Sequence, residues 1–134
     1  MKANYYLIVL LMVSSVFFSF TYYQTKPWVV PEKSASTKNP VKSDAESLKL
    51  GKEVWNKHCS VCHGKAGAGD GSKAAQLKTG MEDMSTGAVQ GLSDGALYYK
   101  IAEGRDEMPS FKKKIPDSEE VWSAINFIRT FKKK

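Results

Sequence analysis

The stretch Cys59-Ser60-Val61-Cys62-His63 decides the fold of this 134-residue chain. Two cysteines three positions apart can each form a thioether with one of the two vinyl groups of a single porphyrin, and a histidine that follows directly is then held beneath the iron. The pattern therefore predicts one covalently bound haem c, attached through Cys59 and Cys62, with His63 as the proximal ligand of the iron.

Two other uses of paired cysteines fit the chain less well. A structural zinc site needs four ligands, and the chain has only two cysteines and two histidines, with no second ligand pair elsewhere. A dithiol redox site normally accompanies a βαβ pattern, which the sequence lacks. Both thiols are therefore assigned to haem attachment, and no disulfide is predicted.

The second axial ligand of the iron is expected to be a methionine. His58 directly precedes Cys59 on the proximal segment, so it cannot cross to the opposite face of the same porphyrin. Two of the five methionines fall in an apolar N-terminal run. The remaining candidates are Met81, Met84 and Met108.

Met108 is favoured among these three. Pro109 stiffens the backbone beside it, and Gly104 ends the preceding helical segment, so the methionine lies in an ordered loop that can press a thioether sulfur onto the iron. A lone methionine can equally fill a gap in a core, and Met81 and Met84 stay as alternative ligands.

The sequence from about residue 45 to residue 131 resembles a class I bacterial monohaem cytochrome c. The resemblance rests on four motifs, which are Cys-x-x-Cys-His-Gly at 59–64, Gly-Ala-Gly-Asp-Gly at 67–71, Gly-Arg-x-x-Met-Pro-x-Phe at 104–111, and a closing helix with Trp122 and Phe127-Ile128-Arg129. It implies a six-coordinate iron with one histidine and one methionine ligand, here His63 and Met108. Many relatives have a proline after Gly-Asp-Gly where this chain has Ser72, so the carbonyl that orients the His63 ring is not identified.

The expected fold class is all-α, with three main helices around the haem. One helix should begin near Ser43, in a capping box with Glu46, and end at Cys59. A second should cover 94–103, capped by Ser93, and a third should cover 118–131, capped by Asp117. No alternating strand pattern appears.

Gly51 lies inside the first of these helices, where a glycine costs about 1 kcal/mol relative to alanine. Such a cost suggests a close approach by another element. We therefore expect the first helix to cross the last one near Trp122 or Ile125.

Residues 1–23 are expected to form an N-terminal membrane anchor. The uncharged, mostly apolar run at 5–23 would be about 28 Å long as a helix, enough to span a hydrocarbon core. A cleaved signal sequence is the alternative, but no Ala-x-Ala-like site follows and paired tyrosines flank the run. Either way, the rest of the chain is placed on the outer, periplasmic or extracytoplasmic, side of the cell membrane.

Residues 24–44, rich in Pro, Ser, Thr and Lys, are expected to be a flexible tether, followed by a haem domain at 45–134. The apolar patch Trp28-Val29-Val30 is an exception in this composition. It is interpreted as the interfacial end of the anchor, with docking on a neighbouring protein as the alternative.

An iron with two protein ligands has no open position, which favours outer-sphere electron transfer and disfavours enzyme activity or a small-molecule substrate at the iron. The sequence is therefore interpreted as a one-electron carrier between membrane respiratory partners. Two alternatives are a fixed subunit of a larger respiratory oxidase or reductase complex, and a haem sensor or enzyme with a labile methionine.

The net charge of the chain is +6 at pH 7. Lys112-Lys113-Lys114 follow the Met108 loop, and Arg105 precedes it, so this basic cluster is expected to dock on acidic patches of redox proteins. Nucleic acid is not expected as a partner, given the compartment.

Overall fold

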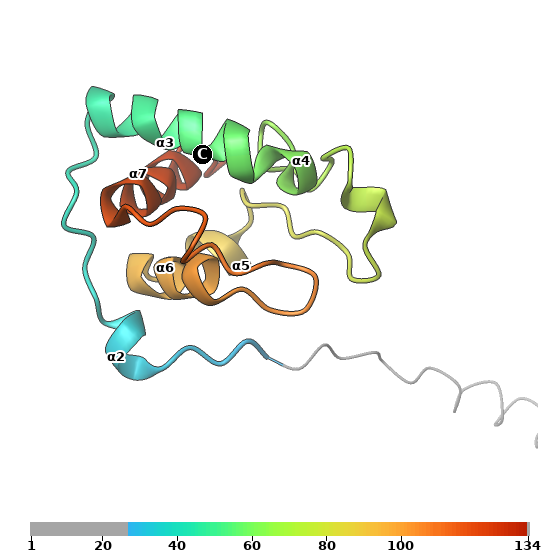
Figure 1. Ribbon diagram of the computed structural model, residues 1–134, viewed down its shortest axis with the longest axis horizontal. Coiled ribbons are helices and arrows are strands. Elements are labelled where there is room, and N and C mark those ends of the chain that lie inside the picture. The colour runs from blue at the N-terminus through green and yellow to red at the C-terminus, as the bar shows by residue number, and fades with distance from the viewer. Residues whose placement is uncertain (1–26, 134) are drawn as a thin grey trace, which may run out of the picture.

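Helices α3 (Ala45–His58) and α7 (Ser118–Arg129) cross closely at the centre of the fold, and α6 (Asp94–Glu103) packs against α7. The computed structural model describes residues 27–133. Figure 1 shows α3 and α7 on one side of α6. The short helical turns are α2 (Glu32–Ala35), α4 (Ser60–His63), η1 (Ala74–Gln76) and α5 (Gly87–Gln90).

The all-α class with three main helices is confirmed for the described part of the chain. No strand forms within residues 27–133, where an isolated bridge pairs Arg105 with Met108. The predicted transmembrane helix at 1–23 lies outside the described residues. Among the helices that are described, none is long and apolar enough to cross a membrane.

The ends of the main helices follow local capping rules. Ser93 caps α6 through a hydrogen bond from Ala96 N–H, and Gly104 ends it, as predicted. The capping box of α3 differs from the prediction, since it joins Asp44 to Ser47 in place of Ser43 and Glu46. Helix α7 begins at Ser118 as predicted but ends at Arg129, two residues before the expected end at 131.

The first and last main helices meet at Gly51, which confirms the predicted close crossing. A Cβ atom added to Gly51 would lie 2.0 Å from the carbonyl oxygen of Ser123, so the contact is with the α7 backbone beside Trp122. The core forms around this crossing, and Trp55 and Ile125 are 1% and 0% exposed. Only a residue without a side chain allows the two backbones to come this close.

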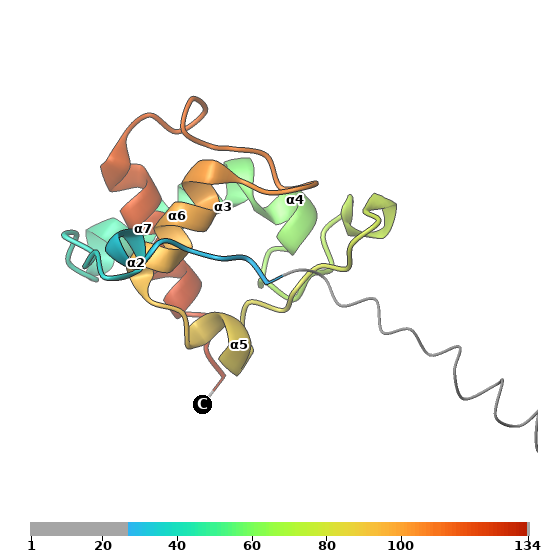
Figure 2. The ribbon, with the colours of Figure 1, turned by 90° about the horizontal axis from the view of Figure 1, so that it is seen from below.

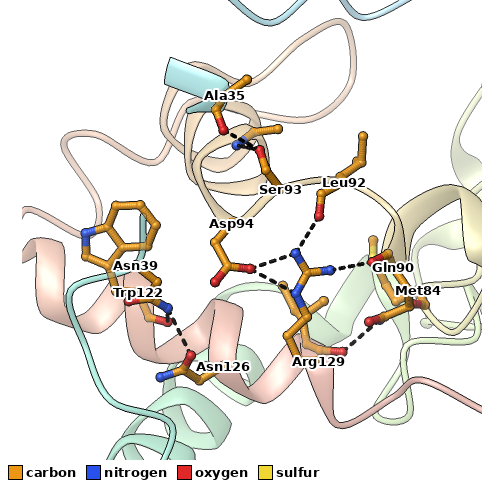
Figure 3. Close-up of polar contacts among 12 residues, drawn as sticks. Ala35, Asn39, Met84, Gln90, Leu92, Ser93, Asp94, Trp122, Asn126 and Arg129 are labelled. Atoms are coloured by element: carbon orange, nitrogen blue, oxygen red, sulfur yellow. Dashed lines mark hydrogen bonds and ion pairs between the residues drawn. The ribbon is translucent and has the colours of Figure 1, made fainter. Parts of the chain in front are cut away.

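Arg129 ties the end of α7 to the start of α6. Its guanidinium donates two hydrogen bonds to Asp94, at 2.9 and 2.7 Å, and others to the carbonyls of Gln90 and Leu92 (Figure 3). Both of these hydrogen bonds end on the same carboxylate oxygen, Oδ1, and both are strengthened by the opposite charges of the two groups. The Phe-Ile-Arg motif of the sequence therefore ends in a residue that joins two helices.

The segment before α3 lies against the helices. Figure 2 shows α2 in front of the main helices, and α2 packs on α6. Asn39 donates hydrogen bonds to the carbonyl of Trp122, at 3.2 Å, and to the Asn126 side chain, at 2.9 Å (Figure 3). A composition rich in Pro, Ser and Lys did not predict these contacts. The domain limits at residues 23 and 44 stay a prediction.

We expect Gly51→Ala to lower the free energy of unfolding by about 3 kcal/mol, because the added methyl group would overlap the Ser123 backbone. Gly87→Ala is the matched control, since a Cβ at that position would have no neighbour within 4 Å. Its effect should stay within about 0.5 kcal/mol. Chemical denaturation of the haem-bound protein measures both, and equal stability of the two variants would contradict the close crossing.

Candidate haem site

The paired cysteines and the histidine lie where α3 passes into α4. Cys59 ends α3 with its N–H bonded to the Trp55 carbonyl, and the N–H of Cys62 and of His63 both donate to the Cys59 carbonyl, at 3.1 and 3.0 Å. One tight turn therefore holds both thiols and the imidazole close together. Both cysteines are free and partly buried.

A cavity of about 410 Å³ opens between α3, α6 and α7, and this volume lies in the usual range for a cofactor site. Cys59 and His63 line it from one side, and all three candidate methionines also line it. Cys62 is in the adjacent turn but is not among the lining residues. The apolar wall is formed by residues of the main helices, including Val54, Trp55, Leu97, Ile101, Val121, Ala124 and Ile128.

Burial shifts the pKa values of Cys59 and His63. It raises the pKa of the Cys59 thiol to about 12, with a further contribution from Cys62, and this favours the thiol over the thiolate that a dithiol redox site requires. Burial also lowers the pKa of His63, against an opposing effect of Glu82, and this favours the neutral imidazole that binds a metal. Both effects fit haem attachment.

The Nδ1 atom of His63 is buried and has no hydrogen-bond partner in the described part of the protein. The nearby Gly64 carbonyl accepts a hydrogen bond of 3.1 Å from the Trp55 indole. A histidine ligand normally donates its second ring nitrogen to a carbonyl, a carboxylate or water. The described residues supply no such acceptor for His63, and the contact that orients its ring is with Trp55, whose ring centroid lies 5.7 Å from that of His63.

The glycine-rich loop after His63 lies beside two of the candidate methionines. The N–H of Gly69 donates to the His63 carbonyl at 2.9 Å, and a Cβ added to Gly69 would lie 3.0 Å from the Met81 Cβ. The N–H of Met84 donates to the Gly67 carbonyl at 2.7 Å. Met81 and Met84 therefore lie next to the segment that carries His63.

Met108 is presented by a separate loop at the end of α6. The backbones of Arg105 and Met108 exchange two hydrogen bonds, of 2.8 and 2.9 Å, around a tight turn in which Asp106 has a φ of 52°. Gly104, with a φ of 68°, begins this loop, and a Cβ there would meet the backbone of residues 108–110 at 2.5 Å. The loop geometry therefore depends on glycine at the end of α6.

Glu107 joins the Met108 loop to the 77–80 segment. Its carboxylate accepts hydrogen bonds from the backbone N–H of Thr79, at 2.9 Å, and of Lys78, at 3.0 Å, and from the Thr79 hydroxyl, at 3.0 Å. These hydrogen bonds lower the pKa of Glu107, which keeps the carboxylate ionised at neutral pH. Both joined segments line the cavity, so this contact holds part of its wall together.

Several cavity residues were not predicted from the sequence as site residues, among them Trp28, Lys100, Arg105 and Glu82. Trp28 lines the cavity with Lys100 and Arg105, and the cationic groups of both lie over its ring, with Lys100 Nζ at 5.1 Å and Arg105 Cζ at 4.8 Å from the centroid. The sequence pattern placed Trp28 at a membrane interface, whereas the structure places it on the haem domain. Glu82 also lines the cavity. No local sequence signal pairs Trp28 with residues more than 70 positions away.

The helical fold, the paired-cysteine turn and the cavity together define a class I c-type cytochrome. The chain belongs to the family described as cytochrome c oxidase, cbb3-type, subunit III, whose model matches residues 46–128. Members of this class transfer electrons through a covalent haem, and the Cys59–Cys62 pair of this protein is consistent with that attachment.

One relative agrees with this assignment, and one solved structure shares the fold. Cytochrome c6 of Bryopsis maxima is 30% identical over 73 residues, which cover 54% of this chain and 78% of the relative. The reducing HAO-like protein complex of Kuenenia stuttgartiensis has a similar fold, with a TM-score of 0.63 and 24% identity over 85% of this chain. The present chain spans only 54% of the length of that solved chain.

We expect Glu107→Ala to speed amide hydrogen exchange several-fold at Lys78 and Thr79, because both N–H groups lose their acceptor. Glu53→Ala, which removes an exposed carboxylate from α3, should leave the exchange of these two amides unchanged. Exchange rates of the haem-bound variants, measured by NMR, test the contact. Unchanged protection at both amides in Glu107→Ala would show that Glu107 does not hold this segment.

Proposed function

We propose that this protein is a one-electron carrier whose haem iron is held by His63 and Met108 and whose partners are membrane respiratory proteins. The observation that carries the proposal is that Cys59, His63 and Met108, from two distant parts of the chain, line one largely apolar cavity. When bound, the haem supplies a single redox-active iron. The protein residues hold it and exclude water from it.

The choice of Met108 is supported by the way the loops are placed. Met81 and Met84 lie against the glycine loop that follows His63, on the side of the cavity where the proximal ligand is attached. Met108 belongs to a different loop, at the end of α6, which is closed by its own backbone pair with Arg105. A ligand from outside the segment that carries His63 would be supplied most directly by this second loop.

His63 and Met108 would hold the iron through an imidazole and a thioether, which would leave no open position for a substrate and would allow electron transfer. The thioether favours the reduced iron, so a high reduction potential is expected. The mostly apolar lining adds to this, because a water-poor environment disfavours the more charged ferric form. A carrier without enzyme activity is therefore the proposed role, and a labile methionine ligand is the property that would argue for a sensor.

We place the haem domain on the outer side of the cell membrane, anchored through residues 1–23. The proposal is supported by the long uncharged run in the sequence and by membership of a family of oxidase subunits. A carrier attached in this way would exchange electrons with partners in or near the same membrane.

We expect Met108→Ala to abolish the weak long-wavelength absorption band of a ferric iron–methionine bond and to open the reduced iron to carbon monoxide. Met81→Ala and Met84→Ala are matched controls from the same cavity, and both should keep the band. Optical spectra of the three variants at neutral pH decide between the ligands. Survival of the band in Met108→Ala, with its loss in either control, would reassign the ligand.

The basic cluster Lys112-Lys113-Lys114 is proposed to steer electron-transfer partners. All three side chains are exposed, although Lys112 forms an ion pair with Glu103 and the Lys114 ammonium lies 5.5 Å from the centroid of the Phe111 ring. These contacts hold two of the three cations close to the loop that follows Met108. Long-range attraction by such a cluster weakens as salt is added.

Replacing the three lysines at 112–114 with glutamate should slow oxidation of the reduced protein by ferricyanide, an anionic oxidant, several-fold at low salt. The difference should shrink as ionic strength rises, because screening removes the steering. Lys132→Glu, an exposed change near the C-terminus, is the control and should have a smaller effect. Stopped-flow rates that do not depend on salt in the unmodified protein would eliminate the steering role.

A fixed subunit of a larger respiratory complex is the second candidate. It is favoured by the description of the matched family as an oxidase subunit and by a fold shared with a chain from a multiprotein complex. Purification from detergent-solubilised membranes separates the two. Stable copurification with oxidase or reductase subunits supports the fixed subunit, and isolation as a single chain supports the carrier.

A further inference from the structure

Trp28 forms part of the haem cavity although it precedes residue 46, where the family match begins. Its ring lies under two cations, with the Arg105 guanidinium carbon 4.8 Å and the Lys100 ammonium 5.1 Å from the centroid. Such distances are typical of cation–π contacts. One wall of the site is therefore supplied by a segment outside the part that the family shares.

The segment that carries Trp28 is attached firmly to the domain a few residues further on. The Ser93 hydroxyl donates a hydrogen bond of 2.6 Å to the Ala35 carbonyl (Figure 3). A Cβ added to Gly95 would lie 2.1 Å from the Ser34 carbonyl oxygen, so the backbone of α6 touches this segment directly. In Figure 1 the segment runs from α2 along the same side of α6. Its position is thus determined by backbone contacts as well as by Trp28.

The side chains of the segment face in different directions. Trp28 is half-buried against Lys100 and Arg105, whereas its neighbour Val29 is 79% exposed. If this apolar segment were held only by general burial of its side chains, we would expect both Trp28 and Val29 to be buried. The larger aromatic side chain is the one directed to the cavity.

Lys100 and Arg105 are the cations among the residues that line the cavity in the described structure. Lys100 is partly buried, and burial lowers the pKa of its ammonium group. A poorly hydrated cation is stabilised by an opposite charge nearby. Arg105 already contacts Asp106, at 3.3 Å, and Glu82 is the acidic group that raises the pKa of Lys100. A haem would bring two carboxylates to this same cavity.

We propose that Trp28 covers the carboxylate groups of the bound haem, holding Lys100 and Arg105 in place to pair with them and excluding water from the pairs. The inference rests on the proposed placement of the haem in this cavity. Trp28 is a positioning residue, because it acts on the haem through the two cations and through the solvent that it displaces.

Two consequences distinguish this role from a purely structural one. Without the Trp28 side chain, water would reach the haem carboxylates, and Lys100 and Arg105 would neutralise their charge less completely. Both effects favour the ferric iron, so the midpoint potential should fall. The opened cavity should also let a small oxidant approach more closely, so its reaction with the reduced iron should become faster. A residue that only fastens the N-terminal segment would change stability alone.

The test compares the full-length, haem-bound protein with Trp28→Ala, Trp28→Phe and Val29→Ala. We expect Trp28→Ala to lower the midpoint potential and to speed oxidation by ferricyanide several-fold, with the methionine–iron band unchanged. Trp28→Phe keeps an aromatic face and should restore most of both properties. Val29→Ala alters an exposed side chain of the same segment and should match the unmodified protein.

Gly95→Ala provides an independent test that leaves Trp28 intact. Its added methyl group would displace the segment at Ser34, and it should reproduce the lower potential and the faster oxidation. Unchanged potential and oxidation rate in Trp28→Ala, whether or not its stability falls, would overturn the proposal. Absence of the methionine–iron band from the unmodified protein would instead overturn the His63–Met108 ligation, so the two failures are distinguishable.

Discussion

The close crossing of α3 and α7 is the constraint on which the rest of the structure depends. The backbone of α7 at Ser123 occupies the space that a side chain at Gly51 would fill, so the two helices can approach this closely only with glycine at position 51. This fixes the line of α3, which ends at Cys59, and the following turn α4 then brings His63 to the same cavity. A haem protein with so small a core relies on such a contact, because few other helix pairs are available to align the ligands.

The chemistry of the site follows from how charge is distributed around this frame. Near the cysteine turn, burial raises the pKa of the free Cys59 thiol and lowers the pKa of His63, so it favours the neutral form of both groups. Charged groups gather elsewhere around the cavity, where Lys100, Arg105 and Glu82 line its wall. The arrangement suits a cofactor that has an apolar body and two acidic groups, because the cavity combines a mostly apolar lining with two cationic side chains, Lys100 and Arg105.

The N-terminal segment limits how the cavity can be oriented relative to the start of the described chain. A freely jointed tether would let the haem domain move over a wide range, whereas hydrogen bonds from Asn39 and Ser93 hold residues 35–39 against α6 and α7. Only a short stretch of chain separates residues 35–39 from residue 27, where the described structure begins. The orientation of the cavity relative to the start of the described chain is therefore set by the fold.

The sequence by itself determined the all-α class, the haem-attachment turn and the limits of α6, because these depend on neighbouring residues such as the Ser93 cap and the Gly104 stop. It also indicated the crossing at Gly51, since a costly glycine in a helix needs a reason. Only the tertiary structure decided that Asp44 and not Ser43 caps α3, and that Trp28 belongs to the cavity. Capping depends on which of several adjacent polar residues has the required backbone angles, and the Trp28 contacts join residues that are distant in the chain, so neither leaves a local pattern.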